Sequence, residues 1–271
     1  MNASAQAAST LPRFSASAKR TSRMVAILDL VTERGSISLA ELADTLGVSA
    51  ATARRDLADL ADQNLLLRTH GGANSIDRGN ELPVALRDTR AQEAKHAIAR
   101  EMASRVPTER YAVALSGGTT TATVARELAS HTHLTVVTNS IAVAQLLASS
   151  AGVRVVMTGG FLRPQSLELV GALAEGTFSA VNVGIAILGV DGISAAAGVT
   201  THDETESRTN HAMVAKAQRT VVVADGSKVG RVALAQMAPI EAISMLITDE
   251  SADAAALAAI RAAGVEVVIA Q

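Results

Sequence analysis

The feature that most constrains the fold is a series of short apolar runs, rich in valine and isoleucine, that begins at residue 112. They lie at residues 112–115, 135–138, 153–158, 183–189, 220–224, 244–248 and 265–270. Helical patterns separate most of these runs, at residues 121–130, 141–149, 206–218 and 252–263. Strands and helices that alternate in this way predict a mostly parallel sheet covered by helices on both faces. The larger part of the chain is therefore expected to be an α/β domain.

Small polar residues and glycines follow the first three of these runs, where the strands should end. They are Ser116, Gly117, Gly118, Thr119, Thr120 and Thr121, then Thr138, Asn139 and Ser140, then Gly159 and Gly160. Glycines let backbone amides approach an anion, and hydroxyls beside a helix start add donors. Ligands of open parallel sheets bind beyond the carboxyl ends of the strands, so a site for a polar small molecule is predicted. The alternative is a set of ordinary capped turns. The lysine of a nucleotide-binding P-loop is missing.

A second constraint lies upstream, in residues 38–57. Ser38 and Glu41 form a capping box, apolar residues then recur with helical spacing, and Gly47 suits the left-handed position that ends a helix. Ser49 is a suitable cap for a following helix. Two short helices joined by a tight turn are what a DNA-reading helix-turn-helix requires, although helical hairpins also occur in ordinary protein cores.

The flanking residues favour the DNA-reading interpretation. Residues 23–34 predict a first helix that packs across the other two and stops at Gly35. An apolar run at residues 65–67 leads into a basic, glycine-rich segment at residues 68–73, which indicates a hairpin, or wing. Arg68 would contact phosphate there. His70 has no cluster of other metal-ligating residues around it, so it is expected to be a polar wing residue.

Net charge alone does not support a nucleic-acid partner, because the whole chain carries −2 and residues 1–78 hold nine basic against eight acidic residues. The distribution of charge is more informative. Arg54 and Arg55 lie early in the second predicted helix, whereas Asp59 and Asp62 come later. This polarity suits a helix that enters the major groove with its N-terminus first. The alternative is a solvated face of mixed charge.

Composition limits the class of protein. Hydrophobic residues at 48% and charged residues at 18% are typical of a soluble, well-cored chain. No cysteine is present, which fits the cytoplasm, and no apolar run approaches the roughly 20 residues of a membrane span. The expected organisation is a flexible basic arm at 1–20, a winged helix-turn-helix domain at 21–76, a linker at 77–90 and the α/β domain at 91–271.

Residues 23–73, and in particular the segment VSAATARRDLADLADQNLLLRTHGGA, resemble the DeoR-type bacterial regulators of sugar metabolism. Members usually show VS, a threonine, an aliphatic residue, RRDL and, after a hydrophobic run, R-x-HGGA. Ala53 stands where isoleucine is usual. The resemblance implies that Asp56 holds an arginine in place. The residues it implies at the DNA are Ser49, Ala51, Thr52, Arg54, Arg55, Arg68 and His70.

The segments LGVDGISAAAGVTTHDETESRTNHAM and ADGSKVGR resemble the sensor domain of the same family, which is similar in fold to ribose-5-phosphate isomerase. By this resemblance Asp191 and Glu206 hold sugar hydroxyls and Lys228 supplies positive charge. The other implied effector-binding residues are Gly192 and Thr200. Many relatives read KRAM where this chain has residues 210–213, NHAM, a change that alters either effector choice or merely surface charge. The pair His202 and Asp203 is interpreted as a turn rather than a metal site.

These patterns together predict a cytoplasmic transcriptional regulator, a repressor of carbohydrate-metabolism genes that a phosphorylated sugar releases from double-stranded operator DNA. A homo-oligomer, dimer or tetramer, is expected on repeated half-sites, with no cofactor, metal or membrane. The alternative is a sugar-phosphate isomerase or deaminase with an accessory DNA-binding module, in which Asp191, Glu206 and Lys228 move protons. A DNA-binding scaffold with an empty sensor fold is a third possibility.

Overall fold

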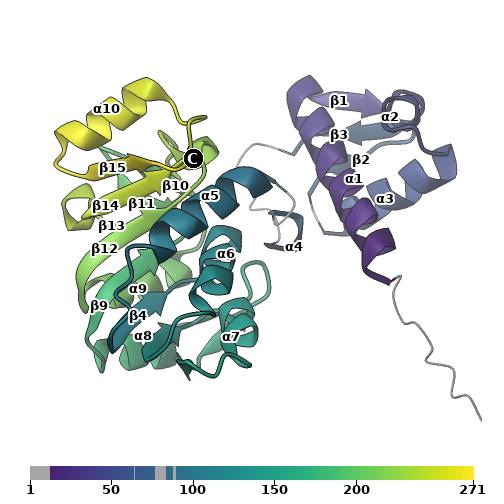
Figure 1. Cartoon of the computed structure of the whole chain (residues 1–271). Coiled ribbons are helices and arrows are strands. Elements are labelled where there is room, and N and C mark those ends of the chain that lie inside the picture. Colours follow the sequence, from purple (N-terminus) through teal and green to yellow (C-terminus); the bar gives the residue numbers. More distant parts are fainter. Residues whose placement is uncertain (1–12, 64, 77–83, 88–89) are drawn as a thin grey trace, which may run out of the picture. The chain divides into compact units, whose positions relative to one another are not determined.

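The computed structural model describes residues 13–63, 65–76, 84–87 and 90–271 (Figure 1). The chain divides into two compact units, an N-terminal unit that ends at Thr89 and a C-terminal unit that begins at Arg90. Helix α1 spans Arg13–Arg34, so it begins ten residues before the predicted start, and the predicted flexible arm is helical from residue 13 onward. Residues 1–12, the rest of that arm, lie outside the described residues.

The predicted linker at 77–90 also contains structure. Helix α4 (Val84–Arg87) lies within it, and the side chain of Leu86 is buried in the core of the N-terminal unit. One apolar residue in a polar segment is thus enough to anchor this helix to the core of the unit. Residues 77–83 and 88–89 lie outside the described residues.

The N-terminal unit is a winged helix-turn-helix. After α1 come β1 (Ser36–Ser38), α2 (Leu39–Leu46), α3 (Ala50–Asp62), β2 (Leu67–Arg68) and β3 (Gly72–Asn74). The three strands form an antiparallel sheet in the order β1-β3-β2, and the β2–β3 hairpin is the predicted wing. Ile27, Leu42, Leu57 and Leu60 are fully buried between the helices, because the apolar stripes of all three helices face one core.

The turn between α2 and α3 is built as the sequence predicts. The Ser38 hydroxyl accepts the Glu41 amide and the Glu41 carboxylate accepts the Ser38 amide, which is the predicted capping box. Gly47 ends α2 in the left-handed conformation, with φ of 61°. The Ser49 hydroxyl then caps α3 by accepting the Thr52 amide over 3.2 Å. These caps fix where each helix begins, and so they fix the direction in which α3 emerges.

The C-terminal unit is built on a seven-stranded sheet in which every neighbouring pair is parallel. Each predicted apolar run forms one of its strands. In spatial order they are β15 (Glu266–Ile269), β14 (Met245–Thr248), β12 (Ala217–Val223), β9 (Val183–Leu188), β4 (Tyr111–Leu115), β5 (Leu134–Thr138) and β6 (Val153–Met157).

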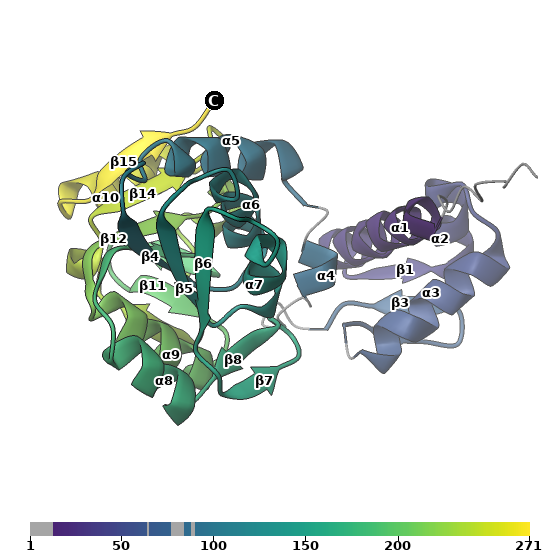
Figure 2. The same ribbon diagram turned by 60° about the horizontal axis from the view of Figure 1, so that its bottom comes forward.

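Alternate strand residues face opposite sides of this sheet, and each side has its own core. Val113 and Leu115 of β4 belong to the core under α5 (Gln92–Ala103), α6 (Thr119–Leu128) and α7 (Ile141–Leu147), whereas Ala114 belongs to the other. The opposite face is covered by α8 (Ala172–Ser179), α9 (Glu204–Val214) and α10 (Ala254–Ala262). Figure 2 shows the sheet between helices α5 and α6 on one side and α8 and α9 on the other. The predicted doubly covered parallel sheet is confirmed.

Several short elements were not predicted. A hairpin of β7 (Phe161–Arg163) and β8 (Glu168–Val170) follows β6, and α8 follows the hairpin. A second small antiparallel sheet contains β10 (Gly192–Ser194), β11 (Gly198–Thr201) and β13 (Ala235–Ala238). Strands of three or four residues are too short to show an alternation of polar and apolar side chains, so the sequence pattern does not reveal them.

Strand order places one point of the sheet apart from the rest. The first strand in the chain, β4, lies between β5 and β9. Strand β5 comes next in the chain after β4, whereas β9 comes only after β5 and β6 have been added on the other side. The connections therefore run in opposite directions from the β4–β9 boundary. A crevice outside the carboxyl ends of the strands forms at such a switch point, and ligands of open α/β sheets bind there.

Candidate effector site and DNA-reading helix

The loops that leave β4 and β9 are tied together at the switch point. The hydroxyl of Ser116, directly after β4, accepts a hydrogen bond from the amide of Gly189, directly after β9, over 3.0 Å. The two loops pack so closely that a Cβ on Gly189 would lie 2.8 Å from the carbonyl oxygen of Gly117. Ser116 therefore fixes the spacing of the two strand ends, and its neighbour Gly117 lies against a third element.

That third element is the β7–β8 hairpin. The Gly117 amide donates to Oε1 of Glu168 in β8 over 2.6 Å, and the side chain of Glu168 is only 2% exposed. A Cβ on Gly117 would lie 2.4 Å from Cγ of Glu168, so only glycine permits this approach. The sequence pattern indicated an anion-binding loop at Gly117, but it did not reveal that a carboxylate of the chain itself reaches the loop.

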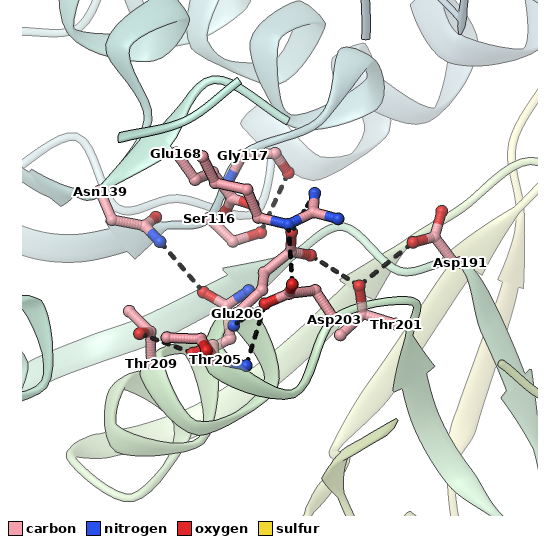
Figure 3. A network of polar contacts seen from close by, with 12 residues as sticks. Ser116, Gly117, Asn139, Glu168, Asp191, Thr201, Asp203, Thr205, Glu206 and Thr209 are labelled. Atoms are coloured by element: carbon pink, nitrogen blue, oxygen red, sulfur yellow. Dashed lines mark hydrogen bonds and ion pairs between the residues drawn. The ribbon is translucent and has the colours of Figure 1, made fainter. Parts of the chain in front are cut away.

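Thr201 connects two of the predicted acidic residues (Figure 3). Its hydroxyl lies 2.7 Å from Oε1 of Glu206 and 3.2 Å from Oδ2 of Asp191. Lys228 Nζ lies 3.4 Å from the other oxygen of Asp191. Asp191, Glu206 and Lys228, which come from three separate segments, are thus brought together as predicted. Thr201, missed by the sequence analysis although its neighbour Thr200 was named, is the residue that connects them.

Glu206 lies in a site that favours its protonated form. Burial of the carboxyl group raises its pKa well above 4.5, and repulsion from the Glu168 carboxylate acts in the same direction. The hydrogen bond from Thr201 and the charge of Arg163 act the other way and are outweighed. A single hydroxyl hydrogen cannot serve two carboxylates. The contact of Thr201 with Glu206, at 2.7 Å, is the shorter of the two, against 3.2 Å for Asp191.

Arg163 of β7 connects the hairpin to the start of α9. Its guanidinium lies 3.2 Å from Oε2 of Glu206 and 3.2 Å from Oδ2 of Asp203. The other oxygen of Asp203 caps α9 by accepting the amides of Thr205 and Glu206. Partial burial acts to raise the pKa of Asp203, but these amides and Arg163 hold it below its usual value. Asp203 is therefore the N-cap of α9, whereas Arg163 carried no signal in the sequence.

Asn139 lies at the end of β5, next to β4, and is fully buried. Its Nδ2 donates to Oδ1 of Asn210 in α9 over 3.4 Å, while its own Oδ1 has no hydrogen-bond partner among the described residues. Asn210 is buried too, so at this position the departure from the KRAM pattern is not a change of surface charge. A basic side chain at position 210 would lie beside Asn139, inside the site.

Other predicted effector residues use their polar groups within the fold. The Thr138 hydroxyl donates to the carbonyl of Leu115 over 2.7 Å and accepts the Ser140 amide over 3.0 Å. Ser140 caps α7 through the amide of Val143. The Thr121 hydroxyl donates to the carbonyl of Gly118 at the start of α6. Thr119 is partly exposed in the first turn of α6, and Thr120 is buried beside it.

The remaining predicted residues shape the loops around the site. The Thr200 hydroxyl donates to the carbonyl of Gly192 and accepts the amide of Ala233. A Cβ on Gly192 would lie 2.4 Å from the carbonyl oxygen of Arg231. Gly159 and Gly160 both have positive φ, which bends the chain from β6 into the hairpin. Gly192 and Gly160 allow close approach of backbone segments, since a Cβ on Gly160 would lie 2.7 Å from the carbonyl oxygen of Val170.

In the N-terminal unit, α3 divides its charged residues between its two sides. Arg54 and Arg55 are exposed, and so is Ala51, while Thr52 is half-buried beside the capping Ser49. In the wing, Arg68 at the end of β2 and His70 in the following turn are also exposed. The predicted DNA contacts therefore lie on the surface and leave the core residues of α3 to the interior.

Asp56 points the other way. It is 2% exposed and pairs with Arg23 of α1 at 2.5 Å and with Arg20 of α1 at 3.5 Å. Arg20, which was assigned to the flexible arm, also pairs with Asp59. The resemblance implied that Asp56 holds an arginine, and these arginines belong to α1, not to α3. The ion pairs fix the first helix against the second half of α3.

Two exclusions apply to the described residues only. No helix among them is long and apolar enough to cross a membrane. No group of three or more histidine, aspartate and glutamate side chains among them is arranged to hold a metal ion. The polar network at the switch point can instead offer backbone amides to an anion and carboxylates to hydroxyl groups.

Comparison with known families and proteins agrees with this division. Residues 23–79 match the DeoR-like helix-turn-helix domain, and residues 90–250 match the DeoR C terminal sensor domain. The chain is 36% identical to a putative aga operon transcriptional repressor of Escherichia coli O157:H7, over 90% of this chain and 91% of that protein. It is 38% identical to the HTH-type transcriptional regulator GlpR of Haloferax volcanii, over 89% and 94% of the two chains. It is 34% identical to the glycerol-3-phosphate regulon repressor of Escherichia coli K12, over 85% and 91%.

Solved structures match part of the chain at lower similarity. Ribose 5-phosphate isomerase A from Neisseria gonorrhoeae has 19% identity and a TM-score of 0.39, over 52% of this chain and 54% of that one. The ribose 5-phosphate isomerase of Methanocaldococcus jannaschii has 18% identity and a TM-score of 0.37, over 51% and 54%.

A winged helix with exposed arginines, an α/β unit with a buried polar network, and relatives named as regulators define a DNA-binding transcriptional regulator rather than an enzyme. The chain belongs to the DeoR family of transcriptional regulators.

Proposed function

We propose that this protein is a cytoplasmic repressor of carbohydrate-metabolism genes whose binding to operator DNA is relieved by a phosphorylated sugar. The observation that supports a phosphorylated sugar as the effector is the arrangement of polar groups at the β4–β9 switch point. There a glycine amide already holds an anionic group, and Asp191, Thr201 and Glu206 form a row of hydroxyl-binding groups next to it. Amides suit a phosphate, and carboxylates suit sugar hydroxyls.

The DNA contacts are proposed for α3 and the wing. Arg54 and Arg55 lie on the exposed side of the first half of α3, where the capped N-terminus of a recognition helix meets the major groove. Arginine recognises guanine with two parallel hydrogen bonds, and each such contact contributes about 1–3 kcal/mol of discrimination. Arg68 and His70 of the wing are proposed to contact the phosphate backbone.

The coupling between the two sites is proposed to be a linkage. A phosphorylated sugar binds more tightly to one arrangement of the sensor domains than to the other, and it shifts the population away from the arrangement that fits DNA. One winged helix makes few contacts, so a dimer or tetramer on repeated half-sites is proposed. Two relatives support this proposal: both are named as repressors, one of the aga operon and one of the glycerol-3-phosphate regulon, and the second name contains a phosphorylated compound.

The test uses the full-length protein and labelled DNA fragments from upstream of its own gene and of the neighbouring genes. Fluorescence anisotropy identifies the bound fragment, and a panel of sugar phosphates is then titrated into the complex, each beside its unphosphorylated sugar. Release by a phosphorylated member, without release by its unphosphorylated counterpart, supports the proposal. A fragment that stays bound with every phosphorylated sugar contradicts it.

A further inference from the structure

We propose that Glu168 occupies, in the free protein, the place that the effector's phosphate takes on the Gly117 amide, so that the effector binds by displacing the β7–β8 hairpin. The inference rests on the proposed function, since it assigns a phosphate to this loop. It adds an internal competitor, a carboxylate of the chain itself. This competitor lowers the apparent affinity of the site for the phosphate group.

The contact between Glu168 and Gly117 is that of an anion in a backbone cradle. Oε1 lies 2.6 Å from the amide nitrogen, a short distance for a neutral donor and a charged acceptor, and the carboxylate is almost fully buried. The missing side chain at Gly117 leaves the space into which the carboxylate fits. A phosphate oxygen on the same amide would have to take this space.

The amide belongs to the start of a helix that lacks a side-chain cap. Helix α6 is ten residues long, begins after Gly118, and is capped by no side chain of the described residues. The neighbouring junction at α7 is capped by Ser140, and that at α9 is capped by Asp203. The Glu168 carboxylate therefore meets the positive end of the α6 dipole at the Gly117 amide, two residues before the first residue of the helix.

An independent observation comes from Asn139. Its Oδ1 is buried and has no hydrogen-bond partner among the described residues, which leaves an acceptor unsatisfied at the same edge of the sheet. The hairpin also covers this residue, because the Leu169 amide donates to the carbonyl of Asn139 over 2.7 Å and Glu168 bridges to Ser140. Displacement of the hairpin would open Asn139 to a ligand hydroxyl, which would satisfy the orphaned oxygen.

Electrostatic repulsion prevents the Glu168 carboxylate and a phosphate group from occupying this site at the same time. Glu168 lies close enough to Glu206 to act on it electrostatically, and a phosphate dianion added beside Glu168 would meet a second negative charge in a buried site. The displacement also has a path to α9, because Arg163 lies opposite Glu168 in the backbone register of the hairpin and its guanidinium contacts Asp203 and Glu206. Movement of the hairpin would therefore either break the contacts of Arg163 with the start of α9 or move the start of α9 with it.

The test compares phosphate binding by wild type, Glu168→Gln and Glu168→Ala, with inorganic phosphate as the probe in calorimetric titrations. Glutamine keeps an acceptor for the Gly117 amide but removes the charge, so the bound anion becomes a weaker competitor. Because the glutamine variant lacks the charge-assisted hydrogen bond that competes with phosphate, it should bind phosphate roughly tenfold more tightly than wild type. Glu109→Gln, an exposed residue in the turn before β4, carries the same change of charge and should bind phosphate like wild type.

Hydrogen exchange of the wild type supplies a second measurement that does not depend on any variant. Saturating inorganic phosphate should increase exchange of the amides in residues 161–170. The inference is overturned if Glu168→Gln binds phosphate no tighter than wild type, or if the hairpin keeps the same protection when phosphate is bound. Operator release separates this result from the proposed function. Release of wild type by a sugar phosphate, without tighter binding by the variant, overturns only the role of Glu168. Tighter binding of phosphate, without release by any phosphorylated sugar, overturns only the proposed function.

Discussion

Asp56 of α3 accepts a hydrogen bond from Nε of Arg23 in α1 over 2.5 Å. The next two residues toward the N-terminus, Arg55 and Arg54, are exposed, whereas Asp56 is 2% exposed. Three consecutive residues, Arg54, Arg55 and Asp56, therefore have two different roles. The arginines face outward, where DNA is proposed to bind, and the aspartate faces inward and holds the first helix of the domain against α3.

Asp56→Ala should destabilise the N-terminal unit by roughly 2 kcal/mol. The substitution leaves the guanidinium of Arg23, which is 22% exposed, without its main partner and empties a buried position. Asp59→Ala is the matched control, because its ion pair with Arg20 is more exposed and should contribute less than about 1 kcal/mol. Denaturant unfolding of both variants gives the comparison. Equal losses of stability would mean that burial of Asp56 has no special effect.

Replacing both Arg54 and Arg55 with alanine should weaken operator binding by at least about tenfold while leaving the melting temperature unchanged. Both side chains are exposed, so the fold loses little, whereas each base contact contributes about 1–3 kcal/mol. Arg34→Ala, an exposed arginine at the end of α1, tests whether loss of any positive charge has the same effect. Anisotropy titrations at one fixed salt concentration are needed, since all such affinities depend on salt. Wild-type affinity in the double variant would remove α3 as the DNA-reading helix.

Gly72→Ala should disrupt the wing, whereas Gly71→Ala should not. A Cβ on Gly72 would lie 2.0 Å from the carbonyl oxygen of Ile37 in β1, so β3 would have to move away from its partner strand. A Cβ on Gly71 meets nothing within 4 Å. We expect Gly72→Ala to cost about 1–3 kcal/mol, as overpacking of a tight contact does. Thermal unfolding of the two variants provides the measurement, and indistinguishable curves would contradict the packing argument.

The sequence predicted the parts of this fold that have strong local signals. Capping residues such as Ser38 and Ser49 and the left-handed Gly47 set the helix ends of the N-terminal unit. Runs of valine and isoleucine predicted all seven strands of the large sheet, because strands buried on both faces are continuously apolar. The start of α1 was not predicted, since the polar residues before Arg23 show no apolar stripe.

The candidate site was only partly predictable. Asp191, Glu206 and Lys228 were named from the resemblance, and they do meet. Glu168 and Arg163 were missed, because they lie in strands of three residues that show no period and reach the site only through the hairpin. Contacts of this kind depend on tertiary packing between distant segments, and no pattern within either segment encodes them.

The protonation of Glu206 gives a prediction about pH. Its pKa in the folded protein is raised above 4.5, so between that value and the raised one the folded protein binds more protons than the unfolded chain. The contribution of Glu206 to the free energy of unfolding is therefore largest at or below about pH 4.5 and is lost as pH rises. In Glu206→Gln this loss is absent, so the difference in stability, variant minus wild type, should increase from pH 4.5 toward neutrality. Denaturant unfolding at a series of pH values measures it. A difference that decreases over the same range would mean that Glu206 is held ionised.

The central proposal is tested most directly by titrating a phosphorylated sugar into the complex of the full-length protein with its operator fragment. The proposal predicts that one member of a sugar-phosphate panel lowers the anisotropy to that of free DNA, and that the same sugar without its phosphate leaves the complex intact. Equal release by the two forms, or release by neither for every sugar tested, would contradict it.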